Sequence, residues 1–88
     1  MTFRLRVSRD ALRYLRRLDA PSQERIAQRI DQLLDDPLAP RLGKPLRGQT
    51  DLRAARVGGW RLLYAVDRES QTVTVERIAQ RGQVYRNL

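Results

Sequence analysis

The chain has 88 residues, of which 41% are hydrophobic, which suffices for one domain with a modest core. It contains no cysteine and no histidine, so disulfides, thiolate chemistry and the usual zinc ligands are excluded, and we expect neither a metal nor another cofactor. The net charge is +8, and all but one of the 18 basic residues are arginines. Because the arginine fork binds phosphate or carboxylate bidentately, this composition predicts nucleic acid or an acidic protein as partner.

The first third of the chain predicts one strand followed by two helices. Residues 3–7 alternate apolar and arginine side chains, which is the period of a half-buried strand. Ser8 suits the N-cap of a short amphipathic helix that carries a leucine at every third position and ends near Asp19. Pro21 suits the first turn of a second helix, whose apolar stripe continues through Asp36. We expect the two helices to form a hairpin.

Several arginines fall outside the apolar stripes of these two helices. We interpret them as a solvated helical face; they are Arg13, Arg16, Arg17, Arg25 and Arg29. The N-terminal segment has no continuous apolar run, so we expect it to be neither a signal peptide nor a membrane span. A cytoplasmic location is therefore expected.

The second half of the chain predicts strands. Residues 37–50 are rich in proline, glycine and basic residues, which indicates an irregular connection. Residues 52–57 and 60–66 predict a β-hairpin around Gly58-Gly59, because glycine occupies the positive-φ positions of a tight turn without steric cost. After a polar turn, residues 72–78 alternate again and predict a further strand.

These elements predict a single domain over residues 1–88 with four strands and two helices. The fold class is α+β: an N-terminal strand, a helical hairpin, and then a three-stranded antiparallel meander. We expect one mostly antiparallel sheet, with the helices on one of its faces and the other face open.

A two-residue turn also determines which side chains share a face of the hairpin. It places Val57 opposite Trp60 and Arg56 opposite Arg61, so both guanidiniums lie on the same face. Like charges in this position repel each other, so an anion between them would explain the arrangement, whereas a solvated arginine pair is the plainer alternative. The larger apolar set of the second hairpin strand should pack under the helices and leave the arginines on the open face.

The residue types restrict the chemistry. No motif pairs two carboxylates for acid–base catalysis, no glycine-rich loop joins a strand to a helix, and no histidine can activate a serine. RNA cleavage does not require a nucleophile from the protein, because the ribose 2′-hydroxyl is itself the nucleophile. Arginines can hold the scissile phosphate, and a tyrosine in their field can transfer a proton. Such a metal-independent scheme can be built from Arg56, Arg61, Arg81 and Tyr85.

Three segments give the chain a resemblance to a known family. Residues 45–48 (PLRG), 56–64 (RVGGWRLLY) and 78–86 (IAQRGQVYR) resemble the toxins of the RelE/ParE superfamily of bacterial type II toxin–antitoxin systems. The resemblance implies a microbial-ribonuclease-like fold and, for the RelE-like branch, cleavage of mRNA in the ribosomal A site. It also implies a toxin–antitoxin hetero-oligomer, in which an acidic or amphipathic segment of a cognate antitoxin folds on the basic surface.

Four residues match functional positions of that family and are assigned a catalytic role. They lie before the hairpin turn, just after it, after the last strand and near the C-terminus: Arg56, Arg61, Arg81 and Tyr85. Three further cations are assigned to RNA binding: Lys44, Arg47 and Arg53.

The sequence also departs from the family pattern. Ala54, Gln80 and Gly82 stand where basic residues are common in RelE-like toxins, and Arg53 cannot replace a cation at position 54 because it points to the opposite face. Two other functions therefore stay open. One is inhibition of DNA gyrase, as in the ParE-like branch, and the other is RNA or antitoxin binding without catalysis.

Overall fold

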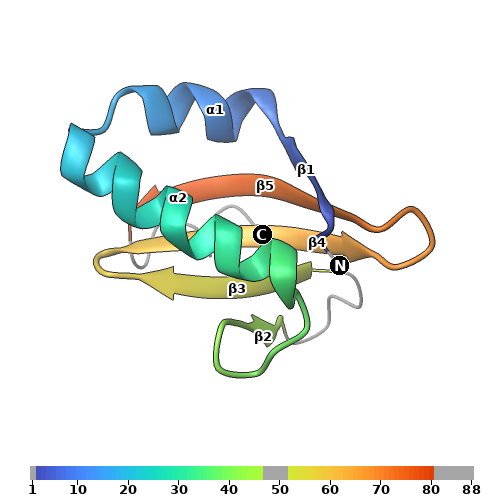
Figure 1. Cartoon of the computed structure of the whole chain (residues 1–88). Coiled ribbons are helices and arrows are strands. Elements are labelled where there is room, and N and C mark those ends of the chain that lie inside the picture. The colour runs from blue at the N-terminus through green and yellow to red at the C-terminus, as the bar shows by residue number, and fades with distance from the viewer. Residues whose placement is uncertain (1, 47–51, 81–88) are drawn as a thin grey trace.

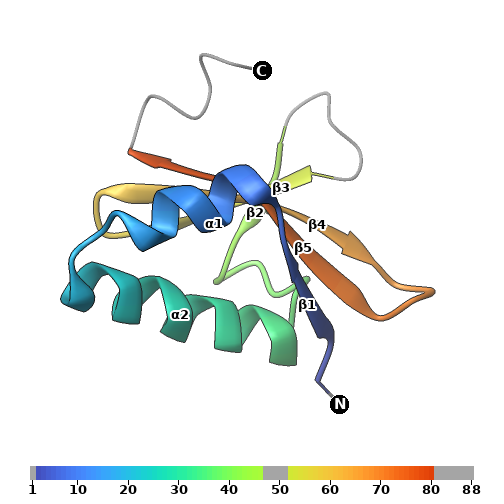
Figure 2. The ribbon, with the colours of Figure 1, turned by 90° about the horizontal axis from the view of Figure 1, so that it is seen from above.

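A computed structural model of the chain describes residues 2–46 and 52–80 (Figure 1). Two helices and five strands follow one another in this order: β1 (Arg4–Val7), α1 (Arg9–Arg16), α2 (Ala20–Asp35), β2 (Lys44–Pro45), β3 (Leu52–Val57), β4 (Trp60–Asp67) and β5 (Thr72–Gln80). The strands form one sheet in the order β1-β5-β4-β3-β2, in which β1 runs parallel to β5 and the other neighbours are antiparallel. Both helices cover the same face of the sheet (Figure 2). The predicted α+β fold with a mostly antiparallel sheet is confirmed.

The predicted number of strands was wrong, because residues 37–50 contain a short strand. Lys44 pairs with Ala54 and Pro45 pairs with Arg53, so β2 adds a fifth strand at the edge of the sheet. A strand of two residues that includes proline has no alternation for a sequence pattern to detect.

Local signals explain where the helices begin and end. The backbone N–H of Ala11 donates to Ser8 Oγ at 3.1 Å, which caps α1 as predicted, and Ser8 Oγ itself donates to the carbonyl of Glu76 in β5 at 2.6 Å. Helix α1 ends at Arg16, earlier than predicted, with Arg17 as its C-cap. Helix α2 carries its proline in the first turn and ends at Asp35, as the sequence indicates.

The core lies between the helices and the sheet. Helix α2 contributes Ile26, Ile30 and Leu33, and the sheet contributes residues from its three long strands, among them Ala55, Val57, Leu62, Tyr64, Val73, Val75 and Ile78. The register of β4 against β5 shifts between Leu63 and Tyr64, where β5 has one extra residue in a β-bulge. Leu62 therefore faces Ile78, and Tyr64 faces Val75. The hairpin side chains that were predicted to pack under the helices do so.

The N-terminal strand is less buried than its alternating sequence predicts. Among the described strands, β1 lies at the sheet edge and pairs with β5 alone, and Leu5 is 43% exposed. Within the described part of the chain, neither helix is long and apolar enough to cross a membrane.

Candidate functional site: a cationic pocket beside the hairpin

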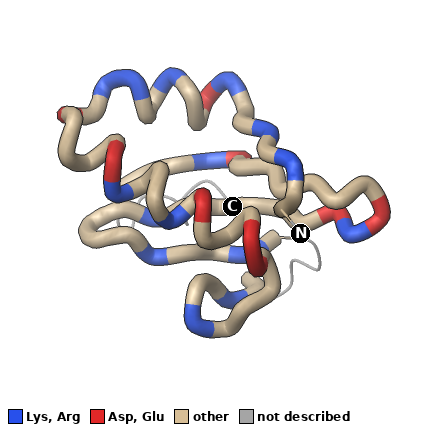
Figure 3. The backbone as a smooth tube through the Cα atoms, in the orientation of Figure 1, with Lys and Arg blue, Asp and Glu red and all other residues tan. Residues whose placement is uncertain are grey.

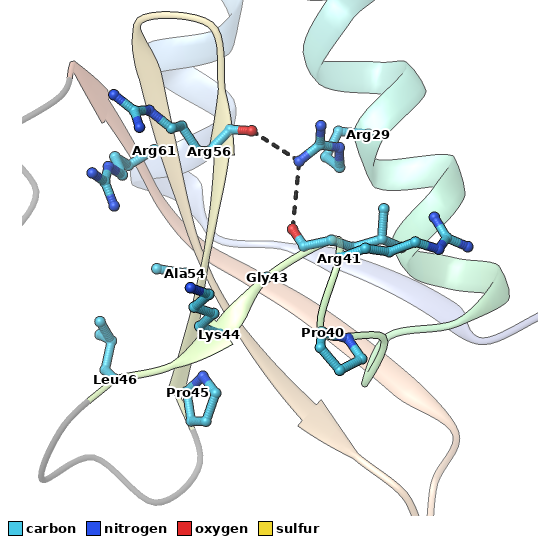
Figure 4. A pocket seen from close by; sticks show the side chains of 11 residues that line it. Arg29, Pro40, Arg41, Gly43, Lys44, Pro45, Leu46, Ala54, Arg56 and Arg61 are labelled. Carbon is cyan, nitrogen blue, oxygen red and sulfur yellow. Dashed lines mark hydrogen bonds between the residues drawn. The ribbon is translucent and has the colours of Figure 1, made fainter.

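The β3–β4 hairpin has the predicted register. Val57 pairs with Trp60 and Arg56 pairs with Arg61, and Gly58, the first residue of the turn, has a φ of +56°. A positive φ at that position is the feature of type II′ turns, which match the twist of the two strands. Arg56 and Arg61 therefore extend side by side from the face opposite the helices (Figure 4).

Arg29 of α2 reaches the edge of this hairpin. Its Nη1 donates to the carbonyl of Arg56 at 2.8 Å and to that of Leu42 at 3.4 Å (Figure 4). Its Nε donates to Gln32 Oε1 at 3.1 Å. The interpretation of Arg29 as part of a solvated face was therefore wrong. The sequence does hold a signal for this position, because Arg29 follows Ile26 by three residues and precedes Leu33 by four, at the border of the apolar stripe.

The hydrogen bond from Arg29 also identifies the kind of strand pair that Arg56 and Arg61 form. Because the Arg56 carbonyl accepts from a helix on the outer side of β3, it is directed away from β4. Arg56 and Arg61 thus form a non-hydrogen-bonded antiparallel pair, the kind whose Cα atoms are about 4.5 Å apart and whose side chains lie closest together. Two guanidiniums in this arrangement repel each other unless an anion lies between them.

A pocket of about 400 Å³ opens between this hairpin and the loop that precedes β2. Its cations come from α2, the loop, β2 and both hairpin strands: Arg29, Arg41, Lys44, Arg56 and Arg61. Among the described residues, no aspartate or glutamate lines it. The potential in the pocket is therefore strongly positive, which favours an anionic ligand.

Two carboxylates lie in the exposed β4–β5 turn, at the end of the sheet away from the pocket. Asp67 and Glu69 belong to the β4–β5 turn, at the end opposite the Gly58-Gly59 turn (Figures 1 and 3). In the described ranges, no three acidic side chains come together as they would to hold a metal ion.

The wall of the pocket is built on a close contact between the loop and the sheet. A Cβ on Gly43 would overlap the buried Tyr64 hydroxyl and would lie 2.9 Å from the Ala54 carbonyl oxygen. The Gly43 carbonyl also accepts a hydrogen bond from Arg53 Nη2 at 3.1 Å. The backbone just before Lys44 is therefore held tightly against β3 and β4.

The structure brings together some of the predicted site residues and separates others. Arg56, Arg61 and Lys44 line one pocket. Arg53 lies on the helix side of the sheet, where it pairs with Tyr64 and its Nη2 donates to the carbonyls of Gly43 and Leu38. The three remaining predicted residues lie outside the described part of the chain: Arg47, Arg81 and Tyr85.

Comparison with known proteins identifies the family. The family model described as ParE toxin of type II toxin–antitoxin system, parDE, matches residues 5–85, which is nearly the whole chain. The chain belongs to the RelE/ParE family of toxins. The resemblance found in the sequence is thereby confirmed, and the protein is a toxin of a type II toxin–antitoxin system.

Two toxins of Mycobacterium tuberculosis are similar to this toxin in sequence. Toxin RelE is 35% identical over 88 residues, covering 96% of this chain and 87% of its own. Toxin RelG is 45% identical over 47 residues, and that match spans about half of each protein, 52% of this chain and 54% of RelG.

Solved structures show the same fold. The isolated Escherichia coli RelE toxin superimposes with a TM-score of 0.80 at 27% identity, covering 97% of this chain and 93% of that one. A chain of the M. tuberculosis RelBE2 toxin–antitoxin complex gives a TM-score of 0.79 at 32% identity, covering 92% of this chain and 100% of that one. The likeness therefore extends over the helical layer and the sheet.

Proposed function

We propose that this toxin is a ribosome-dependent endoribonuclease that cleaves mRNA in the A site and so stops translation. The observation that carries the proposal is the Arg56–Arg61 pair, whose neighbouring guanidiniums border a cationic pocket without acidic lining residues in the described part of the chain. Such a pair is suited to the two non-bridging oxygens of a phosphodiester. The similarity to proteins named RelE supports the same conclusion.

The proposed reaction needs no metal. The ribose 2′-oxygen attacks the phosphorus, the bond from phosphorus to the 5′-oxygen breaks, and a 2′,3′-cyclic phosphate and a 5′-hydroxyl remain. Arg56 and Arg61, joined by Arg81, stabilise the negative charge that accumulates on the phosphate oxygens. Tyr85 takes part in the transfer of the proton from the 2′-hydroxyl to the leaving 5′-oxygen.

The other assigned cations bind the RNA around the scissile phosphate. Lys44 and Arg47 are proposed to contact flanking phosphates directly. Arg53, which donates to loop carbonyls on the helix side, serves RNA binding by holding the loop that carries Lys44.

We further propose an antitoxin as the partner that controls this surface. The similar solved structures include the M. tuberculosis RelBE2 complex and the intact E. coli RelBE complex, both toxin–antitoxin assemblies. An acidic or amphipathic antitoxin segment would cover the pocket in a hetero-oligomer and neutralise its arginines. The free toxin would act in the cytoplasm, where translating ribosomes are found.

Cleavage of a translated message tests the proposal. Purified toxin is added to a bacterial translation reaction, and primer extension together with analysis of the 3′ ends reports cuts in A-site codons that end in a cyclic phosphate. We expect Arg61→Ala to slow cleavage by about a hundredfold or more, since it removes one stabiliser of transition-state charge. Arg68→Ala, in the exposed β4–β5 turn, is the matched control for loss of one positive charge. Cleavage at the full rate by the Arg61→Ala variant would contradict the assignment.

Gyrase inhibition is the second candidate, because the matching family model carries the ParE name. A supercoiling assay with purified gyrase distinguishes the two functions. Loss of supercoiling together with an intact message would replace the ribonuclease proposal. Growth arrest that survives Tyr85→Phe, without any cleavage of mRNA, would instead indicate a member that binds RNA without cutting it.

A further inference from the structure

Lys44 occupies a special position in the cationic pocket. Strand β2 pairs with β3 in a register that places Lys44 opposite Ala54, so the two side chains share a face of the sheet. Position 54 lies on the same face as Arg56, two residues away. Ala54 fills little of the space above the sheet, and the Lys44 side chain runs beside it with its ammonium end toward the two arginines (Figure 4).

The distances between sheet positions allow these cations to meet one ligand. Adjacent strands are about 4.8 Å apart, and positions 54 and 56 are about 7 Å apart along β3. The flexible four-carbon stem of a lysine spans the first of these distances and part of the second. One phosphate over Ala54 can therefore contact the Lys44 ammonium from one side and the Arg56 and Arg61 guanidiniums from the other.

The backbone that carries Lys44 is fixed, in contrast to an ordinary loop lysine. Gly43 packs so closely against Tyr64 that a Cβ would overlap the tyrosine hydroxyl. Its carbonyl accepts from Arg53, and the Leu46 N–H donates to the Leu52 carbonyl at 2.9 Å. Contacts on both sides of Lys44 thus fix the position from which its side chain leaves the sheet. Exposed edge lysines also prevent strand pairing between molecules, but that role does not require a fixed position beside the arginines.

The geometry points to Lys44 as a catalytic cation that contacts the scissile phosphate, in place of a charge that Ala54 does not supply. This inference rests on the proposed ribonuclease function and assigns to Lys44 more than the contact with flanking phosphates. Lys44 forms no covalent bond in the reaction. It donates hydrogen bonds to a non-bridging phosphate oxygen, and these strengthen as the pentavalent phosphorus gains negative charge.

The inference is tested by moving the positive charge from position 44 to position 54, its partner on the neighbouring strand. The variants are Lys44→Ala, Ala54→Lys and the double variant, with Arg68→Ala as the control for net charge. We expect Lys44→Ala to lower the cleavage rate on a translated message by about tenfold to a hundredfold, and the double variant to recover most of that loss. Binding to ribosomes programmed with a message that is 2′-deoxy at the cleavage site should weaken much less, because it does not involve the transition state.

Three outcomes are distinguishable. If the wild type cleaves and Lys44→Ala cleaves as fast as Arg68→Ala, Lys44 has no catalytic role and the ribonuclease function stands. If Lys44→Ala is slow but Ala54→Lys restores nothing, the charge over position 54 does not act on the phosphate, and the inference fails. If the wild type itself leaves the message intact, the proposed function fails and the role of Lys44 fails with it. Far-UV circular dichroism of each variant checks its folding.

Discussion

Gly58 and Gly59 form one turn, yet only the first requires glycine. Gly58 has a φ of +56°, a conformation that costs a residue with a Cβ about 1–2 kcal/mol. A Cβ on Gly59 would meet no atom within 4 Å. The turn sets the register that places Arg56 beside Arg61, so the conformation of a single glycine supports the candidate site.

We therefore expect Gly58→Ala to lower the free energy of unfolding by about 1–2 kcal/mol. Gly59→Ala should leave that free energy almost unchanged, since the added methyl group points into open space. Urea unfolding of the two variants followed by circular dichroism makes the comparison. Equal unfolding midpoints for both variants would show that the positive φ carries no strain.

Asp67 makes the β4–β5 turn depend on pH. Its Oδ1 accepts hydrogen bonds from the backbone N–H groups of Ser70 at 3.2 Å and Glu69 at 3.0 Å. These bonds, the one from Ser70 foremost, hold the pKa of the Asp67 carboxyl below its usual value. A carboxyl with a lowered pKa in the folded state stabilises the fold above its unfolded pKa, and the contribution is lost as the pH falls through the lowered pKa.

Asp67→Asn is therefore expected to lower the urea midpoint at neutral pH, and the difference from the wild type should shrink in acid as the wild-type carboxyl becomes protonated. Glu69→Gln is the control, because it removes the same charge two residues away while the backbone of residue 69 still donates. A difference between Asp67→Asn and wild type that stays constant down to acidic pH would contradict the linkage.

At the scale of elements, the short length of β2 leaves a carbonyl of β3 without a strand partner, and a side chain of α2 donates a hydrogen bond to it. Strand β2 pairs with only two residues of β3, so the Arg56 carbonyl near the hairpin turn has no strand beside it. Arg29 donates to that carbonyl and to the carbonyl of Leu42 in the preceding loop. One helical side chain thereby joins three segments of the pocket wall and covers an open sheet edge.

Arg29→Ala should consequently destabilise the protein by about 1–3 kcal/mol, because it removes charge-assisted hydrogen bonds to two carbonyls. Arg25→Ala, which removes an exposed arginine one helical turn earlier, is the matched control. Thermal and urea unfolding measure both variants. If Arg25→Ala is as costly as Arg29→Ala, a general charge effect on the helix explains the loss and the carbonyl contacts do not.

Local sequence patterns correctly predicted the elements that depend on interactions between residues close in the chain. The β3–β4 register followed from two glycines and two apolar runs, and the helices followed from caps and stripes. Periodicity could not reveal that Arg29 has a sheet edge to bind, because the position of that edge depends on residues far along the chain. The pairing of Lys44 with Ala54 depends in the same way on contacts of Gly43 with Tyr64 and Arg53.

At the scale of the whole molecule, the candidate site draws on parts that the sequence keeps apart. The pocket takes cations from α2, from the loop before β2, from β2 itself and from the hairpin. The sequence therefore predicted the arginine pair correctly, because both residues belong to one hairpin, but it could not predict the pocket around that pair. The turn at the other end of the sheet carries charges of both signs, with Arg68 between Asp67 and Glu69 (Figure 3).

The parallel pairing of β1 with β5 has a consequence for how the toxin is made. Arg4 lies opposite Thr72, and the residue before β1 is tied to α2 through the Phe3 N–H and the Leu34 carbonyl at 2.8 Å. A nascent chain that has not yet reached residue 72 lacks β5, the strand that pairs with both β1 and β4. Such long-range closure is slow and occurs late in folding. The complete sheet thus forms only after β5 has been synthesised, so the N-terminal strand made first has to wait for a strand made late before the fold can close.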